Sequence, residues 1–128
     1  MRIETDQVEG ITILRVRDTI PRTEDGRTKF HEAVANAIGD LTEPTVLYIK
    51  EPGSLRPTDV AELLGTVLHA YQKSDRQGIQ APAGQFVLVS PREKRRFPFD
   101  ALSPPPGAPA ILHFADSEAA AIRFLLNG

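Results

Sequence analysis

Cysteine is absent from this chain of 128 residues. The chain therefore has no disulfide framework, no thiolate metal site and no thiol nucleophile. It also lacks any apolar run near the roughly 20 residues that a membrane-spanning helix needs. The amino-terminal segment MRIETDQVEG has acids where the apolar part of an export signal would stand. We therefore expect a cytoplasmic protein without a membrane span.

Excess charge of one sign is lacking too, because 15 basic residues face 17 acidic ones and the formal net charge is −2. This balance gives no electrostatic footprint for nucleic acid or an anionic membrane, so we expect neither as a partner. We interpret the basic run PREKRRF (91–97) as a solvated helix face rather than an anion site. The length and the 41% hydrophobic content predict one soluble domain over residues 1–128.

The motifs of common enzymes are missing as well. No glycine-rich phosphate loop and no G-x-S-x-G nucleophile elbow occurs, which disfavours nucleotide enzymes and the usual α/β hydrolases. His31, His69 and His113 fall on two predicted helices and a strand, without a histidine three or four residues away. We therefore expect no catalytic residues, no metal site and no cofactor.

The pattern that is present begins as a β-hairpin and continues as alternating strands and helices. Residues 2–8 and 11–17 flank Glu9-Gly10 and predict the hairpin, and apolar positions three and four apart predict a helix over 24–39. Short apolar runs then predict three more strands, and striped segments predict three more helices. The expected strands are 45–49, 86–90 and 111–114; the expected helices run from about 58 to 73, briefly from Pro91, and over 116–126. The proline-rich segment 102–110 is expected to be a loop.

This order predicts an α/β fold. The expected sheet is mixed and mostly parallel, with about five strands, an amino-terminal hairpin and about four helices. Ligands and partners of such folds commonly sit outside the carboxyl ends of the strands. There the most distinctive stretch is GSLRPTDVAELL (53–64), where a loop runs into an apolar-striped helix.

Three segments carry a family resemblance that spans nearly the whole chain. VLYIKEPGSLRPTDVAELLG (46–65) aligns with a strand, a loop, D-S-S-G-L and a leucine-rich helix. FVLVSPREKRRF (86–97) and FADSEAAAIRFL (114–125) echo the later segments L-V-G-x-S-P-x-V-R-R and F-x-(D/T)-x-E-E-A-L. In these features the chain resembles the STAS domain of bacterial anti-sigma factor antagonists.

The resemblance implies a signalling protein of transcription regulation. The second serine of the family signature is phosphorylated by a partner kinase that is itself the anti-sigma factor, and Thr58 aligns with that serine. Arg56 and Pro57 stand where the family has aspartate and serine, and Asp59 stands where it has glycine. The partner-binding residues expected from this alignment are Ser54, Arg56, Pro57, Thr58, Asp59 and Glu62.

Other interpretations stay open. Thr58 could simply be the N-cap of its helix, or Pro57 the first helical residue. The chain could also be a STAS-like scaffold that binds a protein without phosphorylation. A third alternative is a relative that handles a small molecule or lipid in a groove near Phe97, Phe99 and Leu102.

Overall fold

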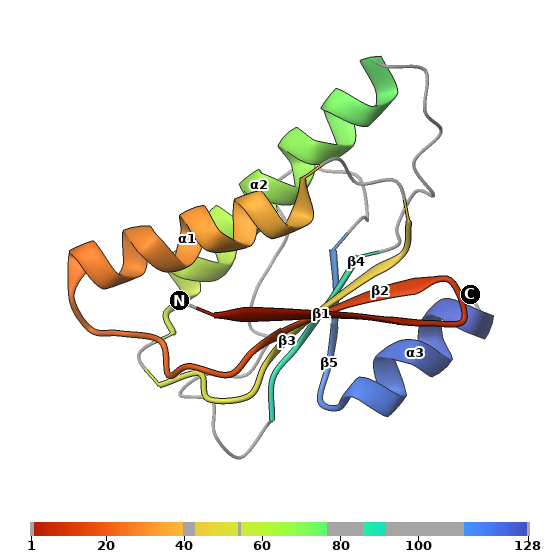
Figure 1. Ribbon diagram of the computed structural model, residues 1–128, viewed down its shortest axis with the longest axis horizontal. Coiled ribbons are helices and arrows are strands. Elements are labelled where there is room, and N and C mark those ends of the chain that lie inside the picture. The colour runs from red at the N-terminus through yellow and green to blue at the C-terminus, as the bar shows by residue number, and fades with distance from the viewer. Residues whose placement is uncertain (1, 40–42, 54, 77–85, 92–111, 128) are drawn as a thin grey trace.

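The computed structural model describes residues 2–39, 43–53, 55–76, 86–91 and 112–127, and shows the predicted α/β fold (Figure 1). A five-stranded sheet has the order β1-β2-β3-β4-β5. The elements are β1 (Ile3–Val8), β2 (Ile11–Val16), α1 (Glu24–Ile38), β3 (Thr45–Ile49), α2 (Pro57–Arg76), β4 (Phe86–Val89), β5 (Leu112–Ala115) and α3 (Glu118–Asn127). The described residues thus hold three helices rather than about four. The helix expected from Pro91 and the 102–110 loop fall outside the described residues.

The amino-terminal hairpin is confirmed, with β1 antiparallel to β2. Glu9 and Gly10 both have positive φ, at 51° and 81°. This pair is the type I′ turn, whose twist matches that of the two strands it joins. Strands β2, β3, β4 and β5 run parallel to one another, so the sheet is mixed and mostly parallel as predicted.

The helices cover both faces of the sheet. Figure 1 views the sheet along its edge, with α1 and α2 on one side and α3 on the other. Alternation along β2 follows this division, because Leu14 and Val16 join the core beneath α1 and α2 while Ile11 and Ile13 join the core beneath α3. No helix in the described part of the chain combines the length and the apolarity needed to cross a membrane.

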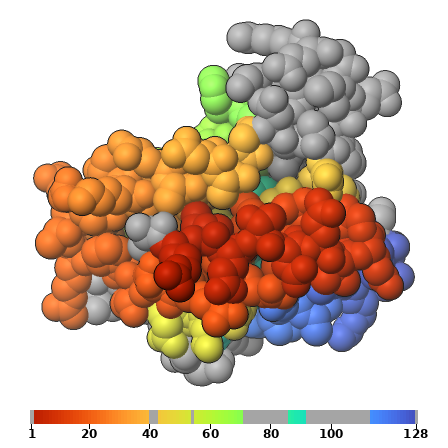
Figure 2. Space-filling view, in the orientation of Figure 1, coloured from red at the N-terminus to blue at the C-terminus, as the bar shows by residue number. Residues whose placement is uncertain are grey.

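Strand β1 forms one edge of the sheet. Figure 2 shows the hairpin, in red, on the surface between α1 in orange and α3 in blue. The exposed edge is charged: Glu4 pairs with Arg17 at 2.9 Å, and Asp6 pairs with Arg15 at 3.2 Å. Charged side chains on an edge strand oppose pairing with a strand from another molecule.

Candidate functional site at the start of α2

The loop from β3 into α2 has a backbone course that only glycine accommodates at one point. Gly53 has a φ of 49°, and a Cβ there would lie 2.5 Å from Thr19 Cγ2. The N–H of Leu55 then donates to the Pro52 carbonyl at 2.8 Å, and the Leu55 side chain is buried in the core. The turn and this buried anchor fix where α2 begins.

Helix α2 is capped by the two residues on either side of Pro57 and Thr58. Pro57 is the first helical residue, so Arg56 occupies the N-cap and its carbonyl accepts the N–H groups of Asp59 and Val60 at 2.9 and 3.2 Å. The Asp59 carboxylate accepts a hydrogen bond from the Arg56 N–H at 2.8 Å. This hydrogen bond is half of a capping box. The prediction of Pro57 as the first helical residue is confirmed. The alternative with Thr58 as N-cap is wrong, because Arg56 already occupies that position and Asp59 closes the cap.

Thr58 is therefore an exposed residue in the first turn of α2. Its hydroxyl forms no hydrogen bond with any residue that the structure describes. Arg56 and Glu62 lie beside it on the surface, with side chains 56% and 61% exposed. Pro57 is exposed too, whereas Ser54 lies outside the described residues.

Asp59 faces inward, unlike its neighbours in the expected partner-binding set. Its side chain is only 4% exposed, and its Oδ2 lies 2.8 Å from Nη1 of Arg27, a residue of α1. Its other oxygen, Oδ1, lies 3.2 Å from Nε2 of His31. The Asp59 carboxylate thus caps α2 and links α2 to α1. It thereby positions the exposed residues at the start of α2.

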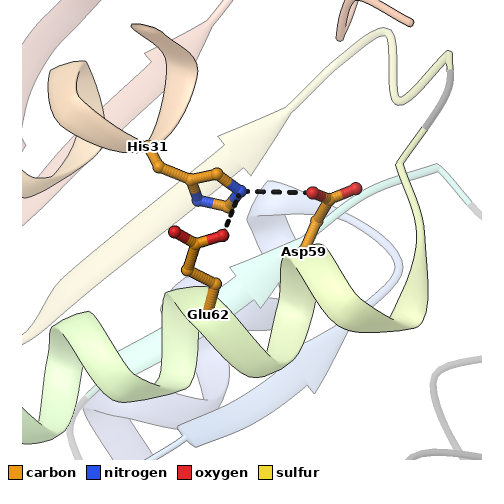
Figure 3. Close-up of side chains that lie close together, drawn as sticks. All are labelled: His31, Asp59 and Glu62. Atoms are coloured by element: carbon orange, nitrogen blue, oxygen red, sulfur yellow. Dashed lines mark hydrogen bonds and ion pairs between the residues drawn. The ribbon is translucent and has the colours of Figure 1, made fainter. Parts of the chain in front are cut away.

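His31 brings a second carboxylate into this cluster. Its Nε2 lies 3.1 Å from Glu62 Oε2, so the imidazole on α1 faces two acids on α2 (Figure 3). Because both neighbours are hydrogen-bond acceptors, we assign a proton to Nε2. The Nδ1 atom is buried without a hydrogen-bond partner in the described part of the chain.

This cluster was not predicted from the sequence, where only histidine pairs were sought. His31 and Asp59 are 28 residues apart, and only the packing of α1 against α2 brings them together. A signal is present in retrospect. Arg27 and His31 stand at helical spacing before the buried Val34 and Ile38, so polar residues occupy positions that should face the core.

The other face of the sheet carries a different polar feature. A hollow of about 190 Å³ at the carboxyl ends of β2 and β3 is lined by Arg15, Val16, Arg17, Tyr48 and Lys50. Arg15 is held there by Glu118 of α3 at 2.6 Å, and this hydrogen bond raises the pKa of Arg15 above its ordinary value. Arg15 and Arg17 both form ion pairs with acids of this chain, so we place the candidate site at α2 instead.

No protein-family model matches the chain, and no curated protein matches it significantly. The STAS resemblance therefore rests on the three sequence segments alone.

Proposed function

We propose that this chain is a protein-binding regulatory module that resembles an anti-sigma factor antagonist. It acts by partner switching with a cognate anti-sigma serine/threonine kinase, and phosphorylation at Thr58 controls the switch. One observation carries the proposal: the Thr58 hydroxyl is exposed on the first turn of α2, and the helix does not need it as a cap.

The fold should tolerate a phosphate at this position. Phosphorylation adds a charge of about −1.5 to −2, and negative charge is favourable at a helix N-terminus. The Arg56 side chain, which is 56% exposed, is close enough in sequence to pair with the new group. Asp59 still accepts the Arg56 N–H, so the phosphorylated helix still begins at Pro57.

A bound partner, in contrast, should be released. Glu62 is four residues after Thr58, on the same side of the helix, so the phosphate adds negative charge to a surface that already carries a carboxylate. A partner surface fitted to the neutral threonine would have to desolvate a doubly charged group there. Binding is lost while folding is kept.

The alternatives differ from this proposal in what they require of Thr58. A scaffold that binds its partner without phosphorylation needs the same surface of Arg56, Pro57, Thr58 and Glu62, with no modification. The groove expected near Phe97, Phe99 and Leu102 for a small-molecule relative lies outside the described residues. Arg56 and Pro57, which replace the family's aspartate and serine, make kinase recognition the step to test first.

The test uses purified anti-sigma serine kinases from the same genome, incubated with this chain and ATP. We expect phosphate on Thr58 by mass spectrometry, none in Thr58→Ala, and unchanged labelling in Thr28→Ala, where an exposed threonine of α1 is removed. If none of the kinases labels Thr58 but one binds the chain, the scaffold alternative replaces the switch. If none binds, the proposed function is wrong.

A further inference from the structure

We propose that His31, Asp59 and Glu62 form a binding site for one divalent transition-metal ion, with zinc as the best fit. The ion would join α1 to α2 at the first turn of α2. This inference does not depend on the proposed function, because it concerns an ion and the three side chains alone.

The three donor atoms already converge. His31 Nε2, one oxygen of Asp59 and one of Glu62 all lie within 4.8 Å of one another. The nitrogen is 3.2 Å from Asp59 Oδ1 and 3.1 Å from Glu62 Oε2. Around a tetrahedral zinc ion with bonds of about 2.0–2.1 Å, neighbouring ligand atoms are roughly 3.3 Å apart. An ion can therefore bind Nε2 once the imidazole proton moves from Nε2 to the buried Nδ1, and the two distances from Nε2 to the acids need only a small change.

The surroundings hold the buried ligands in place. Asp59 Oδ2 accepts hydrogen bonds from Arg27 Nη1 and from the Arg56 N–H, both at 2.8 Å, which leaves Oδ1 directed at the imidazole. The His31 ring is 9% exposed and packs beside the Phe30 ring, with centroids 5.0 Å apart. Outer partners of this kind orient metal ligands and strengthen binding.

Glu62 gives the ion a way in. Its side chain is 61% exposed, so it can move aside and close over an entering ion. The same side is open to solvent for a water as the fourth ligand, as in zinc sites with three protein ligands.

The donor types indicate the class of ion. Arg27 and Arg56 both pair with Asp59, at 2.8 and 3.6 Å, so Glu62 supplies the carboxylate charge that most directly meets an entering dication. One imidazole nitrogen with two carboxylate oxygens suits zinc or cobalt, whereas calcium and magnesium take oxygen ligands.

The experiment is a titration of the full chain with Zn²⁺ against a chromophoric chelator, repeated with Co²⁺ to record its absorption spectrum. We expect one ion per chain and a cobalt spectrum typical of four-coordinate geometry. Glu62→Gln should weaken binding at least about tenfold, since it removes a ligand. Because Glu62 is largely exposed, this variant should keep its fold, which a thermal melt without metal checks.

Two control variants separate the site from adventitious binding. Glu32→Gln removes an exposed carboxylate next to His31 in sequence, and His69→Asn removes an exposed histidine of α2. Both should bind Zn²⁺ within about twofold of the unmodified chain. The proposal is overturned if Zn²⁺ does not bind saturably at micromolar concentrations, or if Glu62→Gln binds as tightly as Glu32→Gln.

Discussion

The two faces of the sheet are covered in different ways. Beneath α1 and α2, a large apolar core is joined at one end by a buried ionic cluster in which Arg27, His31 and Asp59 are all largely removed from water. Beneath α3, a smaller apolar core is bordered by the Arg15–Glu118 pair, in which each side chain is still 27% exposed.

The difference indicates which face of the sheet holds buried charges in addition to its apolar core. A buried charge is costly unless it is paired, and one whose partner is removed destabilises the fold strongly. An ion pair that is still partly exposed is screened by water and contributes less to stability. Asp59 of the buried cluster follows Thr58 in α2, and His31 contacts Glu62, so the face with the costly charges is also the face with the candidate site.

Removal of Asp59 should have the largest effect on stability. Asp59→Ala leaves the Arg27 guanidinium without this carboxylate and opens the α2 cap, so we expect a loss of about 3 kcal/mol or more in the free energy of unfolding. Urea denaturation measures it. Asp25→Ala is the matched control, since that carboxylate is 83% exposed and its ion pair among the described residues is with Lys29 of its own helix. Equal losses in the free energy of unfolding would show that the buried cluster stabilises the fold no more than an exposed ion pair does.

A core substitution beneath α3 should have the next largest effect on stability. Leu125 is 8% exposed and packs in the smaller core, so Leu125→Ala should cost about 2–3 kcal/mol. The neighbouring Leu126 is 52% exposed, and Leu126→Ala should change stability by less than about 0.5 kcal/mol. Denaturation with and without added salt separates this apolar effect from an ionic one, because the Leu125→Ala loss should not depend on moderate salt. A small loss would mean that α3 packs only loosely on the sheet.

The Arg15–Glu118 pair should contribute less. We expect Glu118→Gln to lower the free energy of unfolding by about 0.5 kcal/mol at low ionic strength, and by less in salt. Thermal melts in two salt concentrations measure the difference, with the exposed Glu9→Gln as the control. A loss as large as that of Asp59→Ala would remove the contrast between the two faces.

The smallest effect is expected at Asp6 on the edge strand. A hydrogen bond from the Gln7 N–H, and next the Arg15 guanidinium, hold the pKa of Asp6 below its ordinary 3.8. A carboxyl whose pKa is lowered by folding stabilises the fold above its unfolded pKa, and that contribution disappears as the pH falls through the folded pKa. Asp6→Asn should therefore be slightly less stable than the unmodified chain at neutral pH, and the two should converge in acid. A gap that stays constant from neutral pH to pH 2 would rule out a titration of Asp6 as the cause.

Much of the fold was predictable, because local patterns decide it. Strand β3 has the predicted bounds. A short apolar run between Pro44 and a glycine-containing loop strongly favours a buried strand. Helix α1 likewise follows its apolar stripe and ends before Gly39.

The site was predictable only in part. Its place at the start of α2 followed from the loop and the stripe. The roles of the individual residues did not follow from the sequence. Asp59 closes the cap through a contact within the first turn, and it holds Arg27 and His31 through contacts between helices. Alignment placed Asp59 and Glu62 together on a partner surface, whereas the structure buries the first and exposes the second.

The central claim is that Thr58 is a switch on a helix that stays folded. The most direct measurement is the dissociation constant for the kinase partner, taken on one preparation of this chain before and after stoichiometric phosphorylation at Thr58. We expect binding at least about tenfold weaker after phosphorylation, with the melting temperature of the free chain nearly unchanged. An unchanged dissociation constant, or a phosphorylated chain that unfolds, would contradict it.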